Sequence, residues 1–236
     1  MKELRYRHEL KFLCTQSQLV LLGEQLDYLM DKDENSGEQG CYTVRSLYFD
    51  DYGNSAMHQK EDGLDVRKKY RIRSYKSGQD EMFRLEIKHR VKDRIRKESC
   101  RLSRDEVQRI LRNEPVLEQY SPERPVLNRF ESERYMRMLS PVIIVEYDRI
   151  PYVYPDGNVR VTMDRNICGS VQTEMVMETK IASIPILETG YHLLEIKYDE
   201  YLPDVIREVL QVVSLQKTSF SKYYLCRMAG REKREK

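Results

Sequence analysis

The sequence contains no tryptophan, no glycine-rich nucleotide-binding loop and no apolar stretch of 18 residues. A membrane-spanning helix needs about 18 or more consecutive apolar residues, so no such helix is expected. Neither G-x-x-x-x-G-K-[ST] nor G-x-G-x-x-G occurs, and any nucleotide must therefore be bound through its phosphates rather than through a glycine-rich turn. No Ser/His/Asp or Cys/His arrangement stands out, which leaves covalent catalysis without support.

Five cysteines are spread along the chain without a C-x-x-C pair or a Cys/His cluster: Cys14, Cys41, Cys100, Cys168 and Cys226. An odd, scattered set argues against a zinc site and for a reducing compartment, where disulfides are rare. The chain begins with Met-Lys-Glu and enters a charged segment, which is not the pattern of a signal peptide. We therefore expect a cytoplasmic location.

Charge is nearly balanced, since 41 Lys and Arg against 39 Asp and Glu give +2. Net charge therefore predicts neither a nucleic-acid partner nor a membrane partner. Charged residues make up 34% of the chain and hydrophobic residues 40%. These proportions indicate a folded protein with a large polar cleft or an unusually polar interior, so any electrostatic function must come from local separation of charge.

Charged and uncharged residues alternate strictly over 83–90. Successive side chains of a β-strand point to opposite faces, so four charged residues share one face: Arg84, Glu86, Lys88 and Arg90. A Glu-x-Lys pair recurs in segments 5–11 and 193–198. A solvated face with cross-strand ion pairs explains one such strand, but three repeats along the chain favour a shared function.

The remaining patterns predict roughly eight strands and about five helices. Capping boxes begin helices after Thr15 and Ser103, and turns are expected at 76–79 and 155–158. Seven of the strands are expected over 5–12, 42–50, 67–75, 82–90, 142–149, 159–165 and 193–199. The helices are expected over 19–30, 103–112, 130–139, 203–213 and 219–228, with an additional short helix around 55–59. No composition break divides the chain, so we expect one α+β domain over 1–236 with a core at about 5–228.

Strands with charges on one parity normally turn that face to water. In this chain, helices with apolar faces are available to cover the apolar parity instead. We therefore expect a closed antiparallel eight-stranded β-barrel, covered by helices, whose charged interior forms a tunnel. Eight strands are about enough to enclose one small ligand.

Basic residues far outnumber acidic ones among the side chains expected to face the barrel interior. The basic candidates are Arg5, Arg7, Lys11, Lys69, Arg71, Arg73, Arg84, Lys88, Arg90, Lys97, Arg149, Arg160, Lys197 and Lys222. The acidic ones are Glu9, Glu86 and Glu195, with either Glu146 or Asp164 left open as a further one. Such an excess of buried cations needs a polyanion to compensate it. Arg-x-Arg on one face suits phosphate, because each planar guanidinium donates two parallel hydrogen bonds.

The glutamates of this interior indicate a divalent cation. Carboxylates, completed by phosphate oxygens and water, are the usual ligands of Mg²⁺ and Mn²⁺. A basic cradle beside a carboxylate-bound metal is the apparatus of phosphoryl transfer. The candidate metal ligands are Glu9, Glu86 and Glu195.

The same residues resemble the VTC domain, the polyphosphate polymerase branch of the triphosphate tunnel metalloenzymes. Segments 5–12 and 42–50 look like its first two tunnel strands. Its later motifs follow in order at Arg71–Arg73, Leu85–Lys88, Lys97, Tyr147–Arg149, Arg160, Leu193–Lys197 and Phe220–Lys222. The closing motif often reads Lys-Phe-Ser-Lys in the family, whereas Ser219 stands at its first position here and Lys217 two residues earlier.

The resemblance implies a tunnel enzyme that transfers the γ-phosphate of ATP onto a growing polyphosphate chain with Mn²⁺ or Mg²⁺. It implies that five residues neutralise the transferred phosphate: Arg71, Arg73, Lys88, Arg149 and Arg160. Substrate binding is expected at Lys11, Lys97, Tyr147, Lys197, Ser221 and Lys222, and metal binding at Glu195 with Glu9 and Glu86. The expected ligands are ATP and polyphosphate or pyrophosphate.

Two other functions fit the same residues. A hydrolytic tunnel enzyme would use water as the nucleophile, and a binding module would hold a polyanion without turnover. Eukaryotic relatives attach to membrane and inositol-phosphate-sensing modules, none of which stands in this sequence. We therefore expect a stand-alone bacterial enzyme, with a separate membrane partner protein left open. The lone histidines are expected to be structural: His8, His58, His89 and His192.

Overall fold

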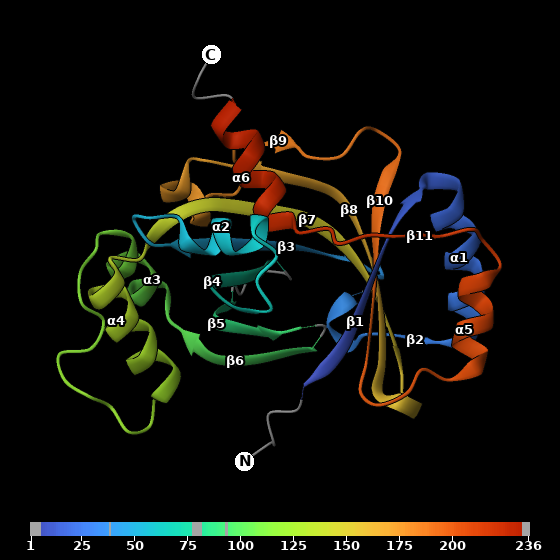
Figure 1. Cartoon of the computed structure of the whole chain (residues 1–236), viewed down its shortest axis with the longest axis horizontal. Helices are drawn as coiled ribbons and strands as arrows, with labels where there is room; N and C mark the ends of the chain where they lie inside the picture. The colour runs from blue at the N-terminus through green and yellow to red at the C-terminus, as the bar shows by residue number, and fades with distance from the viewer. Residues whose placement is uncertain (1–5, 38, 77–81, 93, 233–236) are drawn as a thin grey trace.

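Eight long strands of the computed structural model close into one antiparallel barrel (Figure 1). The structure describes residues 6–37, 39–76, 82–92 and 94–232, so Arg5 and most of the turn expected at 76–79 lie outside it. The barrel strands are β1 (Arg7–Thr15), β3 (Tyr42–Asp50), β4 (Val66–Lys76), β5 (Met82–Val91), β6 (Arg94–Leu102), β7 (Ser140–Tyr154), β8 (Val159–Ser170) and β10 (Tyr191–Tyr198). Their order is β7-β3-β4-β5-β6-β1-β10-β8, and the β7–β8 pairing closes the ring. The predicted barrel is confirmed.

Short strands pair with the strands of this ring, and helices pack around it. The strands β2 (Asp31–Lys32), β9 (Ile184–Pro185) and β11 (Gln216–Lys217) pair with β7, β8 and β1. The helices are α1 (Gln16–Leu29), α2 (Ser55–Glu61), α3 (Arg104–Leu111), α4 (Pro125–Arg137), α5 (Asp204–Gln211) and α6 (Lys222–Glu232), with 3₁₀ turns η1 (Glu34–Ser36), η2 (Asp156–Asn158) and η3 (Thr173–Met177). Within the described ranges, no helix combines the length and apolarity needed to cross a bilayer.

Local signals place most of these elements where the sequence predicts them. Both capping boxes form, at Thr15 with Gln18 and at Ser103 with Glu106. The strand β6 is the main element that the sequence reading missed, because its many charges do not alternate with apolar residues. Pairing with β5 along its full length supplies the backbone hydrogen bonds that make it a strand. The last helix begins at Lys222 rather than at residue 219.

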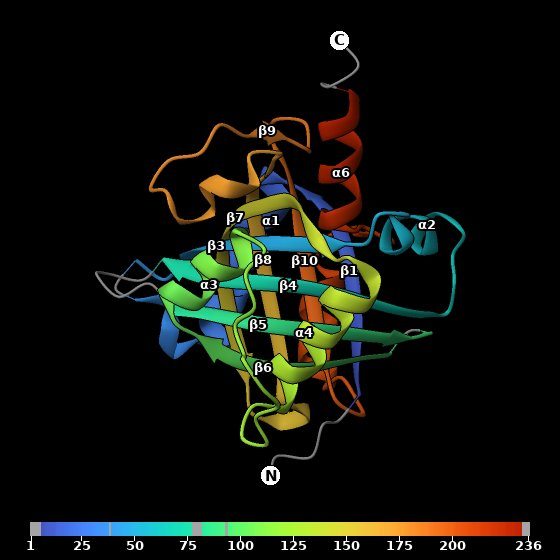
Figure 2. The ribbon, with the colours of Figure 1, turned by 90° about the vertical axis from the view of Figure 1, so that its left-hand side faces the viewer.

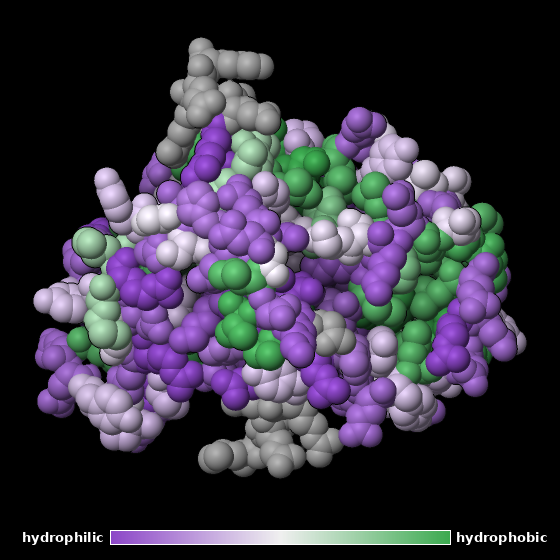
Figure 3. All heavy atoms as spheres, in the orientation of Figure 1, coloured by the Kyte–Doolittle hydropathy of each residue, from purple (hydrophilic) through white to green (hydrophobic). Residues whose placement is uncertain are grey.

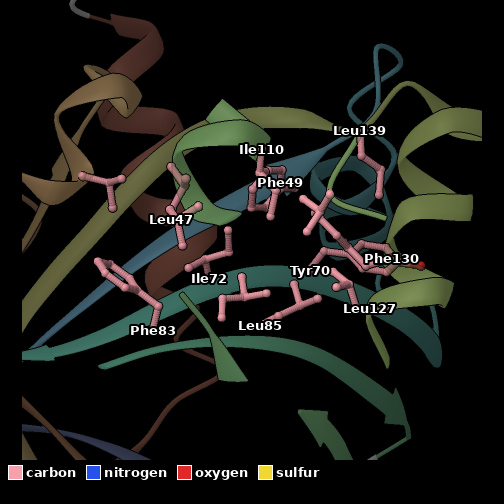
Figure 4. Packing of buried hydrophobic residues seen from close by; sticks show 14 of the residues in the cluster. Leu47, Phe49, Tyr70, Ile72, Phe83, Leu85, Ile110, Leu127, Phe130 and Leu139 are labelled. Atoms are coloured by element: carbon pink, nitrogen blue, oxygen red, sulfur yellow. The ribbon is translucent and has the colours of Figure 1, made fainter. Parts of the chain in front are cut away.

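The apolar parity of the strands packs outward against helices, as Figure 4 shows for one side of the barrel. There, Leu47, Ile72 and Leu85 of β3, β4 and β5 meet Ile110 of α3 and Phe130 of α4. On the other side, α1 and α5 cover β8 and β10. Figure 2 shows α3 and α4 in front of β3 to β6, with the other barrel strands crossing behind. The helices thus form an outer shell and leave the other strand face for the interior.

The interior is divided into a charged part and an apolar part. Near α6, Val44, Val145 and Leu193 pack with Tyr223 and Cys226 of that helix. The helix lies close to β8, because a Cβ added to Gly169 would lie 2.8 Å from Cβ of Cys226. Apolar side chains therefore fill the space under α6, and the charged part of the interior lies beside them.

The seam between β1 and β6 is short. Only the pairs Arg7–Ile95 and His8–Arg94 join these strands within the described residues. Further along the same edge of β1, the two residues of β11 take over, and the amide of Thr218 donates to the carbonyl oxygen of Lys11 at 2.9 Å. The barrel therefore closes partly through the segment that leads into α6.

Apolar side chains also gather on the surface near α1 and α5. Figure 3 shows this region on the right, whereas most of the same face is hydrophilic. Leu10, Phe12, Leu210 and Leu215 line a groove of about 710 Å³ there, between β1 and the segment that follows β10. This groove lies outside the barrel wall and is separate from the interior described next.

Candidate functional site

A cavity of about 120 Å³ lies inside the barrel, which is large enough for several water molecules. Strand parity brings most of the sequence-predicted residues to its wall. These are Glu9, Lys11, Arg71, Arg73, Lys88, Tyr147, Arg149, Glu195, Lys197, Ser221 and Lys222. Five strands, the helix α6 and the segment before it contribute to this set, so the fold assembles residues from the whole length of the chain.

Two glutamates from adjacent strands share their lysine partners. Nζ of Lys11 lies 3.7 Å from Glu9 and 3.4 Å from Glu195, and Nζ of Lys197 lies 3.7 Å and 2.9 Å from the same carboxylates. Although burial raises the pKa of the Glu9 carboxyl, the charges of Lys11 and Lys88 outweigh it and lower that pKa. Burial also opposes ionisation of Glu195, but neighbouring cations hold its pKa well below the ordinary range. We call Glu9 and Glu195 the acidic pair.

Asp164 extends this network to the base of α6. Its fully buried carboxylate accepts from Nε and Nη2 of Arg149 at 2.7 and 2.8 Å. Nζ of Lys222 lies 2.6 Å from Asp164 and 2.8 Å from Glu195. Burial would lower the pKa of Lys222, but Asp164 and Glu195 outweigh it and raise that pKa. The first residue of α6 is thereby fixed in the interior as a permanent cation.

The Arg-x-Arg pair lies on β4 and has two different environments. Nε of Arg71 donates to Glu86 at 2.7 Å, and its Nη1 donates to the hydroxyl of Tyr48 at 2.8 Å. Arg73 donates to Oγ of Ser46 at 3.1 Å and to the hydroxyl of Tyr147 at 3.2 Å. Each tyrosine hydroxyl that accepts from an arginine keeps its own proton available to a phosphate oxygen.

Lys69 and Lys88 face each other across β4 and β5 with little acidic compensation. Burial lowers the pKa of Lys88 to about 7, and the charges of Lys11 and Arg71 act in the same direction against the opposing charge of Glu9. Burial and the charge of Lys88 hold the pKa of Lys69 well below its ordinary value. Nζ of Lys69 lies 3.2 Å from Oγ of Ser221 and 4.6 Å from the ring of Tyr223. An anion that enters between these lysines would stabilise their charged forms.

Three predicted site residues do not line the cavity. Arg160 lies on the parity of Asp164 but four residues toward the barrel end, where Nη1 pairs with Asp33 at 2.9 Å and Nη2 donates to the hydroxyl of Tyr42 at 3.1 Å. Lys97 pairs with Glu86 at 2.7 Å, and its side chain is 45% exposed. Glu86 is fully buried between Lys97 and Arg71.

Glu146 is placed on the other face of the sheet. Its carboxylate accepts from Nε of the fully buried Arg45 at 2.5 Å, and Nη1 of Arg45 also donates to the carbonyl oxygen of Val176 at 3.0 Å. Of the two alternatives Glu146 and Asp164, it is therefore Asp164 that faces the interior. The β-bulge between Glu146 and Asp148 lies close to this point of β7.

Several cavity residues escaped the sequence reading as site residues. Tyr48, Lys60, Arg67 and Tyr223 line the wall. Arg67 shares its parity with Lys69 on β4, so the alternation could have identified it. Lys60 lies on α2 and comes to the cavity only through the packing of that helix, which strand periodicity cannot show.

The predicted metal ligands do not form one group. Among the residues that the structure describes, no three His, Cys, Asp or Glu side chains are close enough to hold a metal ion. Glu86 is paired with Arg71 and Lys97 instead. The acidic pair alone fits Mg²⁺ or Mn²⁺ in the way these ions bind phosphate substrates, with one or two carboxylates and the remaining ligands from phosphate and water.

The family model of the VTC domain matches residues 6–229. The chain belongs to the VTC domain family. The match spans all eight barrel strands, and it confirms the resemblance carried by the motifs. This VTC domain thus combines a closed barrel with a cation-rich cavity.

Solved structures share the fold of this VTC domain. A proposed adenylate cyclase from Bacillus halodurans has 16% identity and a TM-score of 0.57, with 92% of this chain and 94% of that chain covered. The protein PH1819 from Pyrococcus horikoshii has 14% identity and a TM-score of 0.51, with 93% and 97% covered. At these identities the likeness concerns the fold alone. No curated protein matches the sequence.

Proposed function

We propose that this VTC domain is an ATP:polyphosphate phosphotransferase. The terminal phosphate of a polyphosphate chain would attack the γ-phosphorus of ATP, the bond to the β-phosphate would break, and ADP would leave. The observation that supports this proposal is the cation-rich cavity, in which Lys69 and Lys88 lie close together with lowered pKa values. A cavity of this kind is stabilised by a compact polyanion.

The basic residues of the wall would position and neutralise the reacting phosphates. We call Arg71, Arg73, Lys88 and Arg149 the cradle, since all four line the cavity. Little covalent chemistry is asked of a protein that transfers a phosphoryl group, so positioning and charge are the main contributions. Lys11, Tyr147, Lys197, Ser221 and Lys222 would bind substrate oxygens from the remaining wall, whereas Arg160 and Lys97 would require movement to reach them.

The acidic pair would hold Mn²⁺ or Mg²⁺. When bound, the ion would neutralise charge that develops on the phosphate oxygens. In this structure the carboxylates of Glu9 and Glu195 are contacted by lysines. A metal ion bound to these carboxylates would release Lys11 and Lys197 to substrate oxygens. Before the substrate enters, the acidic pair keeps these ammonium groups in place.

Incubation with ATP, Mn²⁺ and a short polyphosphate primer tests the proposal. The expected products are ADP and lengthened polyphosphate, resolved by gel electrophoresis. Release of inorganic phosphate instead would identify a hydrolase. Tight polyphosphate binding without either product would identify a binding module. A cytoplasmic location and a separate membrane partner remain predictions from the sequence.

A further inference from the structure

Three cations stand at the mouth of the cavity, outside the motifs that carry the family resemblance. Arg67 of β4 and Arg90 of β5 are paired in register, and Lys60 reaches them from α2. All three line the cavity and are half-buried. We call Lys60, Arg67 and Arg90 the mouth cluster.

Within the part of the chain that the structure describes, the mouth cluster has no ion pair. Nε of Arg90 donates to the carbonyl oxygen of Lys92 at 2.7 Å, and the exposed Asp65 offsets part of the charge of Arg67. Burial and the charges of Arg67 and Arg90 lower the pKa of Lys60. Like charges directly opposite each other destabilise a sheet. The fold therefore contains a repulsion here that a bound anion would relieve.

The mouth cluster continues the cations of the cavity toward the outside. The pair Arg67 and Arg90 is followed, two residues further in, by the pair Lys69 and Lys88. Side chains on one face of a strand recur at about 6.8 Å, so these pairs form successive rungs along the same two strands. A linear polyanion that begins in the cradle and follows the strands would pass the lysine pair and reach the mouth cluster.

We propose that the mouth cluster is a second phosphate subsite, which binds the outer phosphate groups of a polyphosphate chain whose end occupies the cradle. The inference deepens the proposed function and rests on it, since it takes the polyphosphate chain as the ligand. Guanidinium groups suit phosphate because they donate in pairs. Ile95 and Phe220, which also line the cavity, present apolar side chains and so cannot read the edge of a nucleoside base by hydrogen bonds. Because the mouth cluster would bind the outer phosphate groups, affinity for polyphosphate should increase with chain length.

The test compares binding of pyrophosphate, ATP and long-chain polyphosphate by calorimetry, without turnover. In the double variant Arg67→Gln/Arg90→Gln, we expect the Kd for long-chain polyphosphate to rise at least about tenfold, because two charge-assisted contacts are lost. The Kd for pyrophosphate and the Kd for ATP should each change less than about twofold. The melting temperature should equal or exceed that of the wild type, since a repulsive pair is removed.

Lys68 offers a matched control on the same strand. It points to the opposite face, where Nζ lies 3.3 Å from Glu133. The single variant Lys68→Gln removes one charge, as Arg67→Gln does, and should leave the Kd of all three ligands unchanged. If Lys68→Gln weakens polyphosphate binding as much as Arg67→Gln, the effect is a general one of net charge and the subsite is overturned.

The remaining outcomes separate this subsite from the proposed function. An equal loss for pyrophosphate, or an equal loss for ATP, would overturn the assignment to the outer phosphates of the chain. If the double variant binds long-chain polyphosphate as tightly as the wild type does, the subsite is wrong while the proposed function stands. If the wild type binds none of the three ligands, the proposed function fails as well.

Discussion

Lys88 lies where the cations of the barrel interior meet the acidic pair. Burial and the charges of Lys11 and Arg71 lower its pKa to about 7, although Glu9 lies 3.5 Å away. A phosphate bound beside this ammonium group would favour the charged form. Phosphate binding and protonation of Lys88 should therefore be linked.

The affinity for pyrophosphate should fall as the pH rises from about 6 to about 8, because the free protein loses the Lys88 proton in this range and binding must restore it. The fall should approach tenfold per pH unit above about 7 for a phosphate that binds only the ammonium form. In Lys88→Arg the group stays charged, so the part of the pH dependence that Lys88 causes should vanish. The difference between the two calorimetric pH profiles isolates it from protonation of the ligand. Identical profiles would contradict the linkage.

Glu195→Gln should separate turnover from binding. Loss of a carboxylate of the acidic pair removes a metal ligand, so turnover of ATP should fall at least about 100-fold. Pyrophosphate binding measured without metal should be retained or strengthened, because one negative charge leaves the cavity. Glu174→Gln, which changes an exposed glutamate of η3, serves as the control. Unchanged turnover in Glu195→Gln would exclude this residue as a metal ligand.

Asp50 joins two helices at the edge of the cavity. Its buried carboxylate accepts from the amides of Ala56 and Met57 at the start of α2, at 2.9 and 3.3 Å. It also accepts from the hydroxyl of Tyr223 on α6 at 2.5 Å. The positions of Lys60 on α2 and of Tyr223 beside Lys69 therefore depend on one carboxylate.

Tyr223→Phe should destabilise the protein by about 1 to 3 kcal/mol, because the buried carboxylate of Asp50 loses a hydrogen bond. For a chain of this size that corresponds to a fall in melting temperature of about 2 to 12 °C. Tyr224→Phe changes the neighbouring tyrosine, whose side chain is only partly buried, and provides a matched control in the same scan. Equal melting temperatures for both variants would show that the bond to Asp50 contributes little.

Strand alternation made much of the barrel predictable. Regular segments such as 83–90 show which parity is charged, and helices with apolar faces supply the cover for the other parity. The strand β6 lacks that alternation, and its identity depends on pairing with β5. Lys60 could not be placed at the cavity for a similar reason, because the position of α2 is set by tertiary contacts such as those of Asp50.

The position of a residue along its strand was harder to predict than its face. Arg160 and Arg149 both lie on the inward parity, but Arg149 reaches Asp164 whereas Arg160 is held by Asp33 near the barrel end. Glu86 faces inward, but its carboxylate forms ion pairs with Arg71 and Lys97. Depth in the barrel and choice of partner depend on register between strands that are distant in sequence, which alternation within one strand does not contain.

For the whole molecule, a bound polyanion should act as a stabiliser. A ligand present at 100 times its Kd adds about 2.7 kcal/mol to the free energy of unfolding. The melting temperature should therefore rise by about 5 to 10 °C with saturating polyphosphate. Sodium chloride at matched ionic strength is the control, since it screens the cavity charges without bridging them. An equal shift in both solutions would contradict specific binding in the cavity.

The closure of the barrel has a consequence for synthesis on the ribosome. The first strand, β1, pairs mainly with β10 and β11, which lie about 180 or more residues later. Among the described residues, two pairs join it to β6. Such distant contacts form late. The meander β3–β4–β5–β6, with α3 and α4, can fold while translation continues, but β1 must wait until the C-terminal strands emerge. Until then its charged and apolar faces are both uncovered, so β1 is a segment of this fold that a chaperone would protect during synthesis.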